Sequence, residues 1–328
     1  MTVLAAFPSP PFDSLAIGPL DLHLYGLMIA LGVIAAVWLF GRRLAERGYG
    51  DGEDAGSVGT WGVVGGVVGA RLYHVATEWD RFSDNLGDIP KIWEGGLGIP
   101  GGIVGGVLAG AYAGWRRGLP VSVQLTMAAP ALPLAQAIGR WGNWFNQELF
   151  GRATDLPWAL EVDVEHLPTG YAEGTTFHPT FLYESLWNLG LCGALLLIDR
   201  RRGNQLGPGR LFPLYLVGYG VGRFWIEGLR IDAVELSDVA GLRWNQWVAL
   251  AMIVGGGLWF VVTRPREWPP VAATGEPHEL DDPGESIDEL AALDGVDPAA
   301  LDDVPESPDY PLVDDDDDLG DSSGRPAR

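Results

Sequence analysis

Long apolar stretches alternate along this 328-residue chain with short connectors that carry Arg, Gly or Pro. An apolar stretch of about 20 residues is long enough to cross a bilayer as a helix. Seven stretches meet this requirement: Leu20–Phe40, Ser57–Thr77, Leu97–Trp115, Val121–Gly139, Thr180–Ile198, Leu211–Leu229 and Trp244–Val262. The pattern therefore predicts an all-α polytopic membrane protein with seven transmembrane helices.

Basic residues gather in alternate connectors, which predicts the orientation of the helices. The four Arg-bearing regions are 42–47, 116–117, 200–210 and 264–266. Cytoplasmic loops are enriched in Lys and Arg, so we expect these four regions in the cytoplasm. With seven helices the N-terminus is then outside and the C-terminus inside. The division that follows is an external leader over 1–19, a membrane domain over 20–263 with its longest external segment at 140–179, and a cytoplasmic tail over 264–328.

The tail is polar and acidic. From Val271 onward it holds nineteen acidic and two basic residues, and so supplies about −17 of the formal charge of −22. It contains the run Asp314–Asp318 and few large apolar residues, a composition that predicts disorder. The tail is either a solvated extension or a contact for a basic cytoplasmic partner.

Two compositional features limit the chemistry. Cys192 is the only cysteine and lies within an apolar stretch, which favours a packing role over a disulfide or a thiolate metal site. No His, Asp and Glu residues show ligand spacing on one element, so we expect no metal centre.

Polar residues interrupt the end of the fourth apolar stretch. The segment Gly139–Gly151 reads GRWGNWFNQELFG and places Arg140, Asn143, Asn146 and Glu148 at the predicted outer end of a helix. Charged and amide groups are costly at this depth, so they usually face a protein interior or a wet cavity. There they meet an ion, a lipid headgroup or a partner carboxylate.

A second polar group lies on the sixth stretch. Tyr219, Arg223 and Glu227 follow at intervals of four residues, and Arg230 returns to the same helical face. Arg223 and Glu227 either form an internal ion pair or join the first cluster in one site. Two Arg residues near one phosphate would suit an anionic lipid headgroup, through charge-assisted hydrogen bonds.

Other candidates lie on the same predicted side. Arg71, in the outward half of the second stretch, either joins this cavity or extends to the membrane interface. Tyr25 can bury its ring while its hydroxyl finds a partner. His178, Tyr183 and Glu184 cluster in FHPTFLYES, which opens the fifth stretch, and His178 is there either structural or catalytic.

The motifs resemble those of a known family. GRWGNWFNQELFG resembles the signature of the prolipoprotein diacylglyceryl transferases, and HPTFLYE and GYGVGRFWIEGLR are similar to later motifs of that family. The likeness covers about Leu20 to Val262. It implies transfer of diacylglycerol from phosphatidylglycerol to the lipobox cysteine thiol of a lipoprotein precursor, giving a thioether and glycerol phosphate. It also implies a bacterial cytoplasmic membrane protein with its site near the extracytoplasmic face, no cofactor and no nucleic-acid partner.

The resemblance also implies roles for single residues. Arg140 would bind the lipid phosphate, Asn143 and Glu148 would organise the headgroup pocket, and Gly151 would permit close backbone approach. Arg223 and Glu227 correspond to a second essential pair, and Tyr25 lies in the LYG element of the first helix. We expect further residues to line the substrate pocket, namely Arg71, Asn146, Tyr183, Glu184 and Tyr219.

One position departs from the family pattern. Many members carry a His before a Gly-Gly pair at the start of the third helix, where this chain has Pro100 in WEGGLGIPGG. Proline cannot accept a proton. A general base would then be Glu227, Glu148 or His178, or the thiolate would attack unassisted in the field of the Arg residues.

Two other classes of protein fit part of the pattern. A transporter for an anionic lipid or small anion would also bury Arg and Glu, but its usual internal repeats are not found in this sequence. A membrane scaffold would explain the acidic tail and leave the external polar groups without a role.

Overall fold

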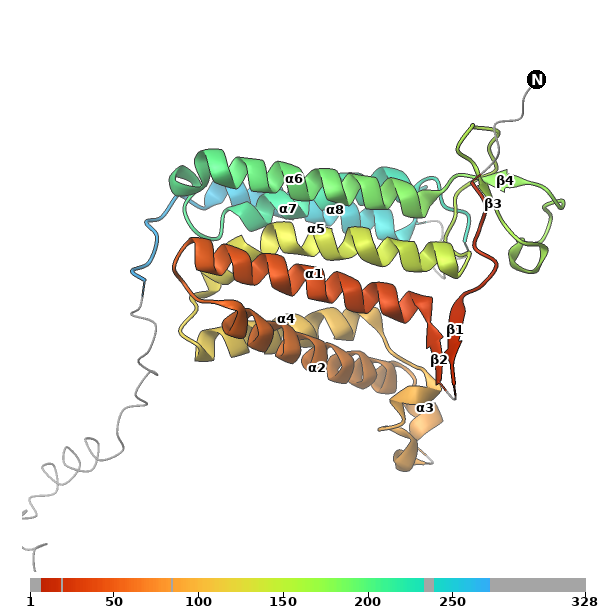
Figure 1. The fold of residues 1–328 in the computed structure, drawn as a ribbon, viewed down its shortest axis with the longest axis horizontal. Helices are drawn as coiled ribbons and strands as arrows, with labels where there is room; N and C mark the ends of the chain where they lie inside the picture. The colour runs from red at the N-terminus through yellow and green to blue at the C-terminus, as the bar shows by residue number, and fades with distance from the viewer. Residues whose placement is uncertain (1–6, 19, 84, 233–238, 272–328) are drawn as a thin grey trace, which may run out of the picture. The chain divides into compact units, whose positions relative to one another are not determined.

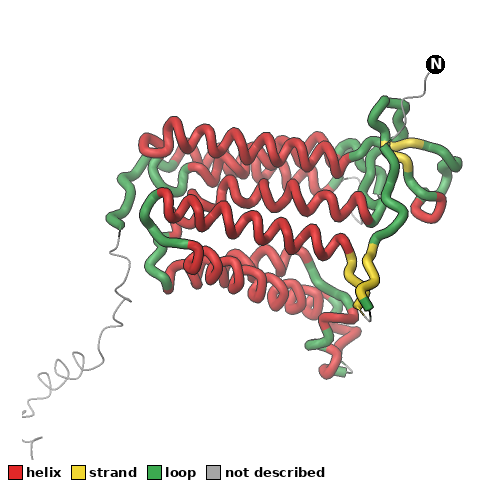
Figure 2. The backbone as a smooth tube through the Cα atoms, in the orientation of Figure 1, coloured by secondary structure: helices red, strands yellow, loops and turns green. Residues whose placement is uncertain are grey.

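The structure is a computed structural model that describes residues 7–271 apart from 19, 84 and 233–238. It is mainly helical (Figure 2). The described residues contain seven long helices: α1 (Leu24–Glu46), α2 (Gly52–Thr77), α4 (Ile99–Arg116), α5 (Val121–Phe145), α6 (Thr180–Leu206), α7 (Leu211–Glu227) and α8 (Trp244–Val262). Each of the seven apolar stretches coincides with one of them. Four, α1, α5, α6 and α8, are each long and apolar enough to cross a membrane, as expected of an all-α polytopic membrane protein.

Short elements gather at one end of the long helices (Figure 1). Strand β1 (Ser14–Ile17) pairs antiparallel with β2 (Leu20–His23), and β3 (Leu160–Glu161) pairs antiparallel with β4 (Thr176–Phe177). The one-turn helices α3 (Trp79–Phe82), η1 (Leu86–Asp88) and η2 (Ile92–Glu94) lie in the α2–α4 connector, and η3 (Val164–His166) lies between β3 and β4. The Arg-bearing connectors α1–α2, α4–α5 and α6–α7 lie at the opposite end, where the chain also leaves α8.

Two of the helix boundaries that differ from the sequence expectation bear on the site. The first helix begins at Leu24, because residues 20–23 pair with β1 as a strand. Helix α5 continues past Gly139 to Phe145, so Arg140 and Asn143 are helical residues of α5 and do not belong to the connector. This extension places both side chains on a rigid element.

One of the two prolines inside α5, Pro130, is compensated by an Arg residue. Pro130 lacks the N–H that would bond to the carbonyl of Thr126. The buried guanidinium of Arg43 donates to that carbonyl at 2.6 Å and to the carbonyl of Met127 at 2.7 Å, and it also pairs with Asp199 of α6 at 2.8 Å. One side chain of α1 thus satisfies the helix break and connects α1, α5 and α6.

Small residues let α2 and α4 lie in close contact. A Cβ added at Gly65 would stand 2.6 Å from the carbonyl oxygen of Gly105, and one at Gly69 would collide with the carbonyl of Gly101. Close contact through small residues is therefore found between α2 and α4. Glycines 218 and 222 of α7 instead leave room for side chains of α6, Leu191 and Trp187.

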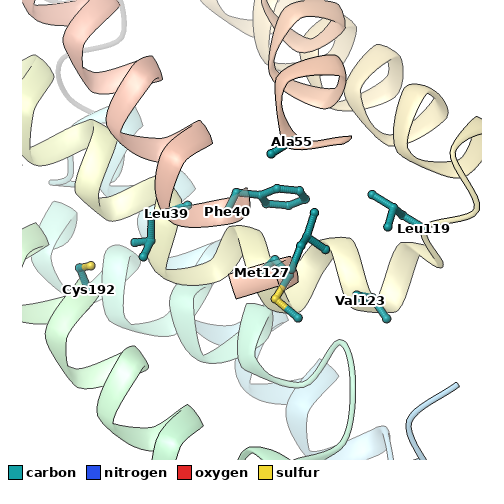
Figure 3. Close-up of a cluster of buried hydrophobic side chains, with 9 residues drawn as sticks. Leu39, Phe40, Ala55, Leu119, Val123, Met127 and Cys192 are labelled. Carbon is teal, nitrogen blue, oxygen red and sulfur yellow. The ribbon is translucent and has the colours of Figure 1, made fainter. Parts of the chain in front are cut away.

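A buried cluster fills the end of the bundle that carries the Arg-bearing connectors (Figure 3). Its side chains come from four helices and one connector, and include Leu39, Phe40, Ala55, Leu119, Val123, Met127 and Cys192. Cys192 is 7% exposed within this cluster, which confirms that its role is packing.

Both ends of the described chain pack on the membrane domain. Phe7 exchanges backbone hydrogen bonds with Ala159 and Glu161, and its ring lies 5.5 Å from that of Trp144. After α8, the ring of Trp268 lies 4.0 Å beneath the guanidinium of Arg47. Parts of the predicted leader and tail therefore belong to the folded unit. Residues 1–6 and the expected disordered tail from 272 onward, with its run of five Asp residues, lie outside the described residues.

Candidate active site

Two guanidinium groups from different helices meet at one carboxylate. Glu184, in the first turns of α6, accepts a hydrogen bond from Nη1 of Arg223 at 2.8 Å and contacts Nε of Arg140. The side chain of Glu184 is 5% exposed and that of Arg223 is 14% exposed. Arg140 of α5 and Arg223 of α7 thus share one environment, and Glu184 stands between them. From the sequence we expected all three residues in one pocket but did not predict that Glu184 joins the two Arg residues.

Glu227 occupies the centre of a second set of contacts. Its carboxylate is fully buried and receives Arg223 at 2.8 Å, Arg243 at 2.9 Å, Asn245 at 3.1 Å and Arg230 at 3.4 Å. The ion pair between Arg223 and Glu227 that the spacing suggested is present, but it belongs to a larger network. The carboxylate has no lone pair facing an open space, so the geometry favours a role in holding Arg223 over a role as general base.

Arg243 is a residue that the sequence analysis missed. Besides Glu227, its guanidinium contacts the carbonyl oxygens of Arg230 and Asp232 and the carboxylate of Asp232 at 3.2 Å. It stands at the start of α8, sixteen residues after Glu227. Only the packing of α8 on α7 brings the two together, so spacing along the chain carried no signal.

The signature segment forms a loop that turns Glu148 back toward α5. Asn143 donates to Oε1 of Glu148 at 2.8 Å, and Asn146 donates to the same oxygen at 3.4 Å. The other side of Asn143 accepts from Nη1 of Arg140 at 3.2 Å. The four polar residues predicted together are therefore connected: Glu148 orients Asn143, and Asn143 orients Arg140.

Gln147, also missed from sequence, holds this loop in place. It adopts a positive φ of 49°, as does Leu149 at 60°, a conformation that costs energy for residues other than glycine. The buried side chain of Gln147 donates to Asp163 at 2.6 Å and accepts from the backbone N–H of Asp163 at 2.8 Å. These bonds to the external segment stabilise the strained turn that aims Glu148.

Gly151 ends the signature where two chain segments come close. A Cβ at this position would lie 2.8 Å from the Cβ of His178 and 3.1 Å from the carbonyl oxygen of Leu229. Its N–H also donates to the carbonyl of His178 at 2.9 Å. The close approach predicted for Gly151 is thus to the protein's own backbone, joining the loop to the start of α6 and the end of α7.

His178 and Tyr183 form a separate aromatic group. Nδ1 of His178 lies 3.1 Å from the hydroxyl of Tyr183, which accepts a hydrogen bond from Trp158 at 2.9 Å. Burial, followed by the nearby charge of Arg152, lowers the pKa of His178 below its ordinary value, so the ring is neutral at pH 7. Among the described contacts, none joins His178 or Tyr183 to the guanidinium pair.

The two other candidate tyrosines, Tyr25 and Tyr219, lie next to the network of Arg, Glu and Asn side chains. The ring of Tyr25 packs on Gly142, where an added Cβ would lie 2.7 Å from Cδ2 of the ring, so the start of α1 lies beside Asn143. Tyr219 lines a small cavity between α6 and α7 together with Glu184 and Arg223.

Arg71 commits its guanidinium to the connector between α2 and α4. Its side chain is buried and donates to the backbone carbonyls of Ile89 at 2.7 Å, Asp88 at 2.7 Å, Gly95 at 2.6 Å and Gly96 at 3.1 Å. Among the described contacts, none joins Arg71 to Arg140 or Arg223. Arg71 therefore organises the connector between α2 and α4, and its place in the substrate pocket stays a prediction.

The arrangement suits the binding of an oxyanion. A guanidinium carries five N–H donors, and the contacts described above engage only some of those of Arg140 and Arg223. Further N–H groups of both side chains are available for a phosphate. Among the described residues no group of three or more His, Cys, Asp or Glu side chains could hold a metal ion.

Long apolar helices with a network of Arg, Glu and Asn at one end define a polytopic all-α membrane protein with a polar site. Comparison with known proteins makes the class specific. Residues 13–262 match the family model of prolipoprotein diacylglyceryl transferase, and the chain belongs to this family.

Similar proteins come from several bacteria and carry the name phosphatidylglycerol–prolipoprotein diacylglyceryl transferase. The chain is 46% identical to one from Frankia alni over 80% of its own length and 68% of the relative. It is 46% identical to one of two from Streptomyces coelicolor, over 80% and 82% of the two chains, and 42% identical to one from Synechococcus elongatus, over 79% and 91%. It spans 63% of a further relative from Frankia casuarinae.

Proposed function

We propose that this enzyme transfers the diacylglyceryl group of phosphatidylglycerol to the lipobox cysteine thiol of a prolipoprotein, with glycerol phosphate as the leaving group. Family membership and the names of the relatives support this reaction. They do not favour the alternative of an anion transporter. The observation that carries the proposal for the site is the meeting of Arg140 and Arg223 at Glu184.

In this proposal Glu184 holds the two guanidinium groups at a fixed separation, and the phosphate of the lipid binds their remaining N–H groups. Negative charge grows on the phosphate as the bond from the glyceryl carbon to the phosphate oxygen breaks. Two preorganised cations stabilise that charge in a site poor in water. Glu227 keeps Arg223 in position, and the chain of contacts from Glu148 through Asn143 does the same for Arg140.

The nucleophile is the thiolate of the incoming cysteine. A thiol of pKa about 8.5 is mostly protonated at neutral pH, and nearby guanidinium groups favour its ionised form. Pro100 occupies the exposed first turn of α4, where a missing N–H costs nothing. Since Glu227 is saturated by donors, the candidates for a base are Glu148, whose second oxygen has no described partner, and the neutral ring of His178.

The location follows from the same pattern. We propose that all seven long helices cross the bacterial cytoplasmic membrane, with the Arg-bearing connectors in the cytoplasm. The network at the opposite end of the helices then lies near the extracytoplasmic face, where secreted precursors present their lipobox. The distribution of the Arg residues over alternate connectors supports this orientation.

The test is an assay of membranes with labelled phosphatidylglycerol and a lipobox peptide. A thioether-linked diacylglyceryl peptide is the expected product. Arg140→Ala and Arg223→Ala should each lower its rate by about 100-fold or more, because each removes a charge-assisted contact made in the transition state. Arg42→Ala, which removes an exposed cation at the other end of the bundle, is the matched control and should keep the wild-type rate. Full activity in Arg140→Ala would refute its role at the phosphate.

A further inference from the structure

A neutral polar layer lies one helical turn below the charged one. Each of the three charged residues has a polar residue four positions further from the external end of its helix. On α5 this is Gln136 below Arg140, on α6 Asn188 below Glu184, and on α7 Tyr219 below Arg223. Four residues of α-helix rise about 6 Å, so the two layers lie about 6 Å apart along the helices. A small chemical group can span this distance.

Asn188 faces a cavity with an unused acceptor. Its side chain is 1% exposed, and its Oδ1 has no hydrogen-bond partner among the described residues. The cavity is lined by Glu184, Asn188, Tyr219 and Arg223, with apolar atoms around them, and offers about 10 Å³. That space holds a single water-sized group. Buried acceptors are normally paired, so Oδ1 indicates a bound group that donates a hydrogen bond.

Gln136 repeats the feature on the neighbouring helix. Its Nε2 donates to the hydroxyl of the buried Tyr215 at 2.9 Å. Its Oε1 is buried and has no partner among the described residues. The layer therefore offers two acceptors from two helices and no described donor for either. Such acceptors suit a small neutral donor, either a hydroxyl or a water.

We propose that this layer recognises the glycerol headgroup of phosphatidylglycerol, with one headgroup hydroxyl in the Asn188 cavity while the phosphate contacts Arg140 and Arg223. The inference rests on the proposed function and adds the determinant of headgroup selectivity. An ammonium headgroup would meet the guanidinium of Arg223 in the cavity wall, and a carboxylate headgroup would meet Glu184 and the acceptor of Asn188. Only a neutral donor of the size of a hydroxyl satisfies all the groups present.

The first experiment uses the wild-type enzyme with two lipids. One is phosphatidylglycerol, and the other is phosphatidylpropanol, whose headgroup has the same carbon chain without hydroxyls. We expect kcat/KM for the analogue to be about one tenth, or less, of the value for phosphatidylglycerol, because its methyl end leaves Oδ1 of Asn188 unpaired. Equal values for the two lipids would overturn the inference without any need for a variant.

The second experiment removes the acceptor. Asn188→Leu keeps the branching of the side chain, and we expect the preference for phosphatidylglycerol over phosphatidylpropanol to fall to about twofold or less. Gln136→Met tests the second acceptor on α5 and should reduce the preference in part. Leu189→Ala, at an exposed position next to Asn188 on α6, is the control and should keep the wild-type preference.

The outcomes distinguish failure of the headgroup inference from failure of the proposed function. If Asn188→Leu lowers kcat/KM for both lipids equally and keeps the preference, the cavity holds only water and the inference is wrong while the proposed function stands. If the wild type forms no thioether product with phosphatidylglycerol, the proposed function fails and this inference fails with it.

Discussion

Replacing Glu227 by Gln separates a structural role from a catalytic one. The carboxylate is completely buried and holds three guanidinium groups and one amide within 2.8 to 3.4 Å. The amide of Gln keeps the shape of the carboxylate but has no charge. It offers one acceptor oxygen, whereas the donors of the wild-type protein surround two. The donors at one position, Arg223 with Arg230 or Arg243 with Asn245, would then face an NH₂ group or lose their partner.

The magnitude follows from the burial. Breaking a buried ion pair by removing one partner costs about 3–5 kcal/mol, since the remaining charge is left uncompensated. For a protein of this size about 1 kcal/mol corresponds to roughly 2 °C, so Glu227→Gln should lower the unfolding temperature by about 6–10 °C. Activity should fall as well, because Arg223 loses one of its two carboxylate partners.

The assay is thermal unfolding of the detergent-solubilised protein, followed by tryptophan fluorescence, together with the rate of thioether formation well below the transition. Glu46→Gln provides the control, because its pair with Arg42 is more than half exposed on both sides and should change stability by less than about 0.5 kcal/mol. A Glu227→Gln protein that unfolds at the wild-type temperature yet has lost turnover would refute the structural role and return Glu227 to the position of general base.

Three further predictions concern the rest of the chain. Pro100→His should neither abolish nor greatly raise turnover; a large gain in the thioether assay would show that a missing base limits this enzyme. Truncation after Val271 should leave the unfolding temperature unchanged, whereas truncation after Arg266 removes the packing of the following segment on α1 and should cost about 1–2 kcal/mol. Because the pKa of His178 is lowered, its neutral form contributes stability that is fully present above 6.5 and is lost as pH falls through the lowered value. A pH series should therefore show a loss of stability below pH 6.5 that His178→Gln reduces; an unchanged acid limb would contradict this.

The sequence by itself determined the number and approximate position of the long helices. The hydrophobicity of a stretch is a local property of the sequence. An apolar stretch of about 20 residues forms a helix inside a bilayer, because the bilayer offers its backbone no other hydrogen-bond partner. Trp244–Val262 was predicted with the bounds that the structure gives. The polar residues of the signature were also visible, since a charge within an apolar stretch stands out without any knowledge of the fold.

Tertiary structure decided which polar groups share an environment. Glu184 joins Arg140 to Arg223 across three helices, and Arg243 reaches Glu227 from the next helix, yet no spacing along the chain encodes either contact. Arg71 shows the opposite case. The sequence also placed it in the outward half of its helix, yet its guanidinium binds four backbone carbonyls of a connector. Hydrophobic periodicity places a residue along its own helix. The rotation and packing of that helix against its neighbours determine which partner the side chain meets, and these depend on contacts between residues far apart in the chain.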